Sequence, residues 1–328
     1  MTDQSVLTSL ALVAGGLILL GFGGEVLLRG AVSLATRLRL TPAVIGLTVV
    51  AAGTSVPELA VSAIAAAQGR TDIAFGNVVG SNVANIALIL GLCALVRPLA
   101  IGGNIIRLEY PVLALVTLMT VALAEDGIVN RLDAVLLVAV YVCFTAYMVT
   151  LVRDRMNAIE EREFGDEVQE FDQSAPGDHR LPVLLALITL GVLLLAGGAS
   201  VTVEGAVGLA TRFGLSERVI GLTIVAIGTS LPEVVTSLVS VARGRDDVAI
   251  GNIIGSNLFN LLGILGVSAL IAPLSVHPGI VASDNWWMLG VTIGLFPIMM
   301  SGRRITRLEG GLLLSVYVIY LGQLLVGS

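Results

Sequence analysis

The chain alternates between long apolar runs and short polar connections over its 328 residues. Most apolar runs approach the roughly 20 residues that an α-helix needs to cross the hydrocarbon core of a bilayer. We expect ten spanning helices, with the ranges 6–28, 43–67, 73–96, 108–124, 132–152, 182–203, 217–242, 248–271, 285–301 and 309–326. The pattern predicts an all-α, multi-pass membrane protein.

One long polar stretch, residues 153–181, interrupts this pattern. It holds nine of the 24 acidic residues between positions 154 and 178. It is too short to fold alone, so we interpret it as a solvated acidic linker and not as a regulatory ion-binding domain. The linker would separate a first five-helix unit, residues 1–152, from a second, residues 182–328.

The two units repeat in sequence. Residues 29–91 align with 204–266 without a gap, and 35 of the 63 positions are identical. Because five helices are an odd number, the second unit would enter the membrane from the opposite side. Inverted repeats are typical of transporters that bind their substrate near the bilayer midplane.

Composition and charge add the orientation and limit the partners. The chain is 56% hydrophobic and 13% charged, where soluble domains carry roughly 25% charged residues. No basic patch suggests nucleic acid, so the expected surroundings are membrane lipid. With the N-terminus outside, 14 of the 18 arginines fall on the cytoplasmic side. The positive-inside rule therefore places both termini outside and the linker in the cytoplasm.

Two copies of one polar motif lie inside apolar runs. Residues 53–58 read Gly-Thr-Ser-Val-Pro-Glu, and residues 228–233 read Gly-Thr-Ser-Leu-Pro-Glu. A charged side chain at the bilayer centre costs roughly 3 kcal/mol on insertion scales, so it indicates function. A proline within a helix also leaves the carbonyl four residues earlier without its usual donor. Each motif thus offers a carboxylate, two hydroxyls and a free carbonyl.

Further polar residues follow each motif at four-residue intervals on the next helix. They are Asn77, Ser81 and Asn85 in the first unit and Asn252, Ser256 and Asn260 in the second. A single hydroxyl in such a helix usually bonds its own backbone, and a single asparagine can join helices. The duplicated set, with two glutamates and no lysine near them, favours a cation site instead.

The ligand atoms limit the cation. All candidate ligands are oxygens, and no Cys, Met or His lies near them, which argues against Zn²⁺ and Cu⁺. Oxygen ligands suit Ca²⁺, Mg²⁺ or Na⁺, and one Ca²⁺ would neutralise two carboxylates. The residues by themselves leave open a divalent or a small alkali cation.

The paired Gly-Thr-Ser-x-Pro-Glu motifs, each followed by Gly-Asn-x-x-Gly-Ser-Asn (76–82 and 251–257), resemble the two α-repeats of the Ca²⁺/cation antiporter superfamily. The chain is most similar to the prokaryotic sodium/calcium exchangers, with repeat motifs at 46–91 and 221–266. The resemblance implies ten helices, in which helices 2–5 and 7–10 form a core and helices 1 and 6 slide across it.

The resemblance also implies a role for each ligand. Ca²⁺ would be bound by Glu58 and Glu233 with the carbonyls of Thr54 and Thr229. Separate Na⁺ sites would use Ala51, Ser55, Ser81, Ala226, Ser230 and Ser256, and Asn85 and Asn260 would complete the middle of the site. Some prokaryotic members have an aspartate in place of Asn260, so a third carboxylate is not expected here.

These features predict a secondary antiporter that exchanges Na⁺ for Ca²⁺ across the cell (inner) membrane, with three Na⁺ per Ca²⁺ implied by the resemblance. A H⁺/Ca²⁺ exchanger is the alternative, because two glutamates could carry two protons. A channel fits an inverted repeat around a closed carboxylate pair less well. No His-Glu-x-x-His motif and no intramembrane Lys or His partner for a serine are present, so an enzyme is not expected. No cofactor is expected, and the oligomeric state stays open, although a monomer is compatible with the sequence.

Overall fold

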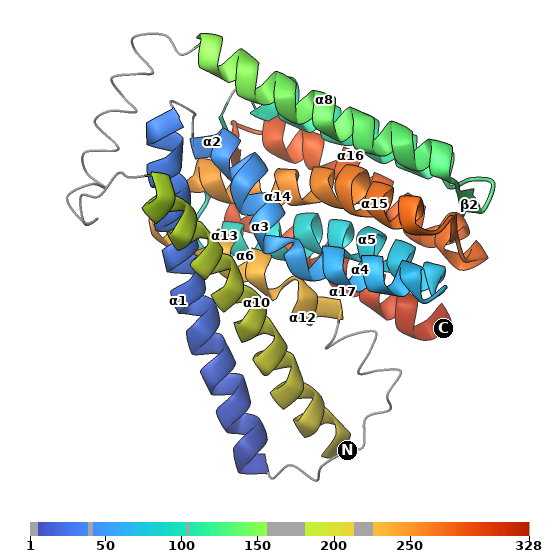
Figure 1. Cartoon of the computed structure of the whole chain (residues 1–328), viewed down its shortest axis with the longest axis horizontal. Coiled ribbons are helices and arrows are strands. Elements are labelled where there is room, and N and C mark those ends of the chain that lie inside the picture. The colour runs from blue at the N-terminus through green and yellow to red at the C-terminus, as the bar shows by residue number, and fades with distance from the viewer. Residues whose placement is uncertain (1–5, 39–41, 103–104, 156–180, 213–225, 328) are drawn as a thin grey trace.

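A computed structural model describes the chain except for residues 1–5, 39–41, 103–104, 156–180, 213–225 and 328. Most of the predicted acidic linker, and the first part of the seventh predicted helix, therefore lie outside the described residues. The described part is helical throughout its long elements (Figure 1).

The elements of the first half are α1 (Val6–Leu38), α2 (Pro42–Ile45), η1 (Gly46–Val50), α3 (Ala51–Thr54), α4 (Val56–Ala67), α5 (Thr71–Val83), η2 (Ala84–Ile89), α6 (Leu90–Val96), β1 (Leu99–Ala100), η3 (Ile105–Glu109), α7 (Tyr110–Leu123), β2 (Ile128–Val129) and α8 (Arg131–Arg155). Those of the second half are α10 (Leu181–Arg212), α12 (Ala226–Thr229), α13 (Leu231–Ala242), α14 (Asp246–Leu258), η5 (Phe259–Ile264), α15 (Leu265–Ile271), β3 (Leu274–Ser275), η6 (Ile280–Asp284), α16 (Asn285–Met300), β4 (Arg304–Ile305) and α17 (Arg307–Gly327). The elements labelled η are π-helical turns.

Length and apolar composition identify six helices that could cross a membrane in the part of the chain that the structure describes, or seven if a bent pair counts as one span. The bent pair joins Gly46–Thr54 to Val56–Ala67 at an angle of 55°. The predicted count of ten spanning helices is neither reached nor excluded by this criterion, and it stays a prediction.

The bounds of the elements recur along the chain. Each element from α3 to η3 has a counterpart of the same length at the equivalent place in the second half, as α4 from Val56 and α13 from Leu231 illustrate. The last helices of the two halves, α8 and α17, also begin at nearly equivalent positions. The repetition seen in the sequence of residues 29–91 thus extends, as secondary structure, well beyond them.

Helices α1 and α10 lie side by side and cross the other helices obliquely (Figure 1). Glycines set their close approach, because a Cβ on Gly191 would lie 2.6 Å from the backbone nitrogen of Leu27, and one on Gly198 2.9 Å from that of Leu20. Small residues allow helix backbones to approach closely in a membrane. Both helices run past the predicted ends at 28 and 203, because Gly30 and Gly205 are single glycines that a helix tolerates and no proline follows before Leu38 and Arg212.

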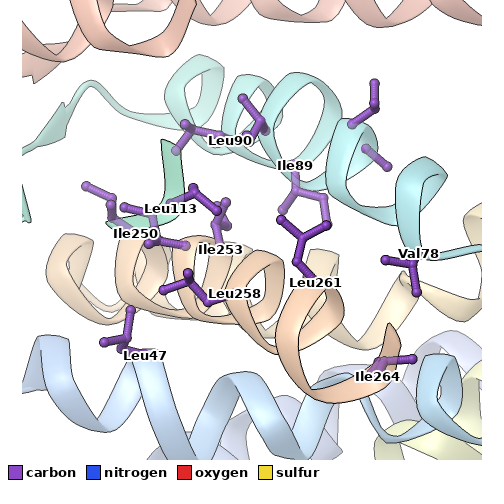
Figure 2. Packing of buried hydrophobic residues seen from close by; sticks show 14 of the residues in the cluster. Leu47, Val78, Ile89, Leu90, Leu113, Ile250, Ile253, Leu258, Leu261 and Ile264 are labelled. Carbon is purple, nitrogen blue, oxygen red and sulfur yellow. The ribbon is translucent and has the colours of Figure 1, made fainter. Parts of the chain in front are cut away.

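The core of the molecule is built around α14, whose residues from Val248 to Leu258 are all buried. Figure 2 shows Ile250 and Ile253 of this helix between Leu47 of η1 and the residues Leu90 and Leu113. Apolar side chains thus surround the helix that carries Asn252 and Ser256, and the cluster keeps these polar residues away from solvent.

The connections contribute four strands of two residues each, which the all-α prediction did not include. Strand β1 pairs antiparallel with β4, and β2 pairs antiparallel with β3. Each pair joins a connection of the first half to one of the second. A strand of two residues is too short to show the alternation of apolar and polar residues that predicts a strand. The sequence pattern therefore did not predict these strands.

Candidate cation site

Both polar motifs break their helices at the second residue before the proline. Ser55 separates α3 from α4 with backbone angles of φ −85° and ψ 12°, and Ser230 separates α12 from α13 with φ −87° and ψ 6°. Pro57 and Pro232 fall in the first turn of the new helix, where a missing N–H does no harm. The break therefore follows directly from the motif.

The two glutamates begin the new helices and are deeply buried. Glu58 lies in the first turn of α4 and Glu233 in the first turn of α13, and each is 1% exposed. The N-terminal end of a helix favours negative charge. The bends thus bring two carboxylates into the interior of the helical core, each at a helix end that stabilises it.

The serines of the two motifs hydrogen-bond across the halves. The Ser55 hydroxyl donates to Oε1 of Glu233 at 2.7 Å, and the Ser230 hydroxyl donates to Oε1 of Glu58 at 3.0 Å. Ser230 also lies 3.5 Å from the hydroxyl of Ser81 on α5. Each glutamate therefore receives a hydrogen bond from the serine of the opposite half, and neither half forms the cluster alone.

The two asparagines predicted at the middle of the site lie in π-helical turns. Asn85 belongs to η2 and Asn260 to η5, and both are buried. The Asn85 amide donates to Oδ1 of Asn257 at 2.9 Å, again across the halves. Single π-helical turns within α-helices occur frequently at functional sites.

Several buried oxygens of these residues have no hydrogen-bond partner among the described residues. They are Glu58 Oε2, Glu233 Oε2, Asn85 Oδ1, Asn260 Oδ1 and Ser256 Oγ. Buried acceptors in proteins are normally satisfied by a donor, by water or by an ion. All five belong to residues that the sequence predicted as ligands, and oxygens of this kind are the ligands that Ca²⁺ and Na⁺ prefer.

The remaining predicted ligands are backbone or hydroxyl groups near the bends. The Ala51 carbonyl already accepts the Ser55 amide at 3.1 Å and the Thr54 hydroxyl at 3.2 Å. A cation at that carbonyl would share or replace these bonds. Ala226 begins α12 and Thr229 ends it, in the positions that correspond to Ala51 and Thr54.

The structure adds residues that the sequence interpretation noted only as a polar stripe or did not single out. Asn77 donates to the carbonyl of Glu58 at 3.2 Å and to Ser62 at 2.9 Å. Asn252 donates to Ser237 at 3.0 Å and accepts from the Thr54 hydroxyl at 3.3 Å. Identity between the two halves at each of these positions was the available signal.

Three ion pairs of the structure do not include the buried glutamates. Arg29 and Arg243 pair with Glu25, and Arg97 pairs with Asp246. In the described part of the chain, no three His, Cys, Asp or Glu side chains cluster as a metal site. The candidate site therefore combines two carboxylates with neutral hydroxyl and amide oxygens.

Known proteins are similar to this chain in sequence over nearly its whole length. The family model of the sodium/calcium exchanger protein matches residues 8–150 and 183–326. CaxA of Alkalimonas amylolytica, described as a putative antiporter, is 39% identical over 318 residues, which cover 96% of this chain and 98% of CaxA. The inner membrane protein YrbG of Escherichia coli is 36% identical over 322 residues, which cover 97% of each chain.

A solved structure agrees as well. The sodium-calcium exchanger NCX_Mj, soaked without Na⁺ and Ca²⁺, superposes with a TM-score of 0.81 at 29% identity and covers 98% of this chain and 100% of its own. The family model alone spans far more than half of the chain on both sides of residues 151–182. This protein is therefore an integral membrane transporter that belongs to the sodium/calcium exchanger family.

Proposed function

We propose that this protein is a secondary antiporter that exchanges Na⁺ for Ca²⁺, with Ca²⁺ bound between Glu58 and Glu233. The crossed Ser55–Glu233 and Ser230–Glu58 hydrogen bonds carry the proposal. They bring both carboxylates into one buried cluster with free acceptor oxygens. A Ca²⁺ ion would neutralise the two carboxylates, and Ca²⁺ accepts six to eight oxygens in flexible geometry.

The neutral oxygens suggest where Na⁺ binds. Ser55 and Ser230 hydrogen-bond to the glutamates in the described arrangement, and these hydroxyls could instead turn their oxygens toward a monovalent cation. Ser81, Ser256 and the carbonyls of Ala51 and Ala226 would complete the Na⁺ ligands. The carbonyls of Thr54 and Thr229 would assist the glutamates in binding Ca²⁺, with Asn85 and Asn260 between the ions.

We further propose ten spanning helices in two inverted five-helix repeats, with both termini outside and the segment 153–181 in the cytoplasm. The arginine distribution and the recurrence of the element bounds in the two halves support this arrangement. The relative YrbG is named as an inner membrane protein, which supports the same location here. Cysteines placed at Gly165 and Ser328, in a protein without Cys93 and Cys143, should be labelled from opposite sides. Labelling of Gly165→Cys from outside would reverse the topology.

A H⁺/Ca²⁺ exchanger is the second candidate, because the two buried glutamates could return two protons for each Ca²⁺. The hydroxyls that surround the carboxylates argue for Na⁺, since proton return would leave Ser81 and Ser256 without a role. The discriminating measurement is uptake of ⁴⁵Ca²⁺ into proteoliposomes loaded in turn with Na⁺, K⁺ or buffer at low pH. Uptake that requires internal Na⁺ is expected, and uptake with a proton gradient alone would favour the alternative.

Charge movement gives an independent test of the coupling. Three Na⁺ for one Ca²⁺ would move one net charge per cycle, whereas two protons for one Ca²⁺ would move none. Each charge is worth about 2.3 kcal/mol per 100 mV. Na⁺-driven flux should therefore respond to a potential set by K⁺ and valinomycin, after a control that K⁺ is not itself transported. A flux independent of voltage would exclude three-for-one exchange.

A further inference from the structure

The two glutamate helices differ in the turns that follow the glutamate. On α13 the residues after Glu233 include Thr236, Ser237 and Ser240, and at three- and four-residue spacing these hydroxyls share one face of the helix. Of the corresponding positions on α4, only Ser62 keeps its hydroxyl. The other two are Val61 and Ala65.

The hydroxyl-bearing face of α13, defined as Thr236, Ser237 and Ser240, is completely buried. The Thr236 hydroxyl has no hydrogen-bond partner among the described residues, and Ser240 donates only to the Thr236 carbonyl at 2.8 Å. Val61, which corresponds to Thr236, is 36% exposed. Ser237 accepts a hydrogen bond from Asn252, whereas Thr236 and Ser240 have apolar counterparts and make no side-chain contact with another helix through their hydroxyls among the described residues.

Helix α1 packs against α13 along this region. A Cβ on Gly24 would lie 3.3 Å from Val235 and 3.8 Å from the Cα of Thr236, so α1 approaches the backbone of α13 closely. The side chain of Val239 also lies 3.6 Å from this Cβ position, so the valines of α13 face α1. The hydroxyl-bearing face lies beside these valines on the same helix.

An ion pair holds α1 at the end of α13. Arg243, the residue that follows the helix, donates to Glu25 of α1 through Nη2 at 2.9 Å and through Nε at 3.1 Å. Glu25 also accepts from Arg29 at 2.9 Å. In the other half the positions of Glu25 and Arg243 are occupied by Ser200 and Gln68, so no such ion pair can form there.

We propose that the hydroxyl-bearing face of α13 lines the path of the cations between Glu233 and one membrane surface, and that the Glu25–Arg243 ion pair closes the mouth of this path. The helix from Glu233 to Arg243 spans about 15 Å, or half of a roughly 30 Å hydrocarbon core. Hydroxyl oxygens at successive turns can replace water around a small alkali or divalent cation. When the ion pair opens, the carboxylate of Glu25 faces the arriving cation. This inference rests on the proposed antiport.

Cysteine accessibility tests the path without a transport measurement. Thr236→Cys and Ser240→Cys, in a protein without Cys93 and Cys143, are treated with a membrane-impermeant cationic methanethiosulfonate reagent from either side. Val61→Cys and Ala65→Cys are the matched controls on α4. We expect labelling at 236 and 240 only from the side where α13 ends, and about tenfold faster labelling when Glu25→Gln is added. The same addition should leave labelling at 61 and 65 unchanged.

A second set of variants distinguishes the loss of the Glu25–Arg243 ion pair from a general loosening of the helix packing. Arg243→Gln should accelerate labelling as Glu25→Gln does, whereas Arg97→Gln, which removes the ion pair with Asp246, should not. Labelling at 236 and 240 that is absent in all these proteins, or equal with and without Glu25→Gln, would overturn the inference.

Where a cysteine variant fails to insert, Thr236→Val is used, and slower Ca²⁺ flux at unchanged Ca²⁺ affinity is expected. Loss of affinity without a change in rate would also overturn it. If the cysteines are labelled from one side but Ca²⁺ uptake does not depend on Na⁺, the proposed path stands. Only the Na⁺ coupling of the proposed function is then rejected.

Discussion

Helices α4 and α13 begin alike and then diverge. Both start after a serine break, with proline and glutamate in the first turn, and both glutamates are buried to the same extent. After the glutamates Ser62 and Ser237 are still alike, but α13 has Thr236 and Ser240 where α4 has Val61 and Ala65. The comparison shows that the first turns of the two helices, with their buried glutamates, are alike, whereas the turns that follow them differ.

The same division appears at the helix connections. The backbone pairing of β1 with β4 and of β2 with β3 is matched between the halves, yet the side chains beside the strands differ. Arg97 forms an ion pair with Asp246 near one strand pair, and the hydroxyls of Thr71 and Ser275 meet near the other. An ionic contact thus accompanies the pair of β1 and β4, and a contact between two hydroxyls accompanies the pair of β2 and β3.

The largest expected effect tests the symmetric part of the comparison. Glu58→Gln and Glu233→Gln should each reduce Ca²⁺ transport more than 100-fold, because removing one partner from a buried charged cluster typically costs about 3–5 kcal/mol. The measurement is ⁴⁵Ca²⁺ uptake into proteoliposomes at equal protein content. Glu125→Gln, at an exposed connection, is the matched control and should transport normally. Near-normal exchange by either buried variant would remove the proposed site.

A smaller effect is expected from the serines that join the halves. Ser55→Ala and Ser230→Ala should each weaken the apparent Na⁺ affinity about tenfold and the Ca²⁺ affinity less, since a hydrogen bond to a charged group is worth about 1.5–3 kcal/mol. Both affinities are obtained from the ion dependence of the initial uptake rate. Equal losses for both ions would contradict separate Na⁺ sites. Unequal effects of the two serines would show that they contribute unequally to ion binding although their hydrogen bonds are equivalent.

A third pair of variants exchanges the differing side chains of α4 and α13 at two equivalent positions. The double variant Thr236→Val, Ser240→Ala, which gives α13 the side chains of α4, should slow uptake about two- to fivefold, because we expect the two hydroxyls together to contribute about 0.5–1 kcal/mol, the lower part of the range for one hydrogen bond. The reverse exchange, Val61→Thr with Ala65→Ser, should leave the rate nearly unchanged. Maximal uptake rates at saturating Ca²⁺ give the comparison. Equal slowing by both exchanges would assign the effect to packing.

The smallest expected effect concerns stability. Asn252→Leu leaves Ser237 without its donor and should lower the melting temperature by a few degrees, since an unsatisfied buried group costs about 1–3 kcal/mol. Asn77→Leu should lower it less, because Asn77 is only partly buried and Ser62 can reach the Ala74 carbonyl. Thermal unfolding in detergent, followed by tryptophan fluorescence, provides the measurement. An equal loss for both would show that the two amides contribute alike.

Local physical chemistry determined much of this protein from its sequence. Apolar runs indicated the membrane helices, proline and serine in each motif indicated the breaks, and a buried carboxylate without a counter-charge indicated a cation site. The duplication marked the candidate ligands, because identity at equivalent positions of the two halves picks out Glu58 and Glu233 together with their hydroxyl neighbours. These inferences need only the local properties of the residues and a comparison of the two halves of the sequence.

The tertiary structure decided which of these groups meet. The serine of each half bonds to the glutamate of the other, Asn85 meets Asn257, and Glu25 reaches Arg243 across 218 positions of sequence. Periodicity assigns a residue to a face of its helix, but the partner depends on how helices far apart in the chain pack together. The helical segments follow from the sequence because they are local, whereas the crossed site and the ion pair beside it follow only from long-range packing.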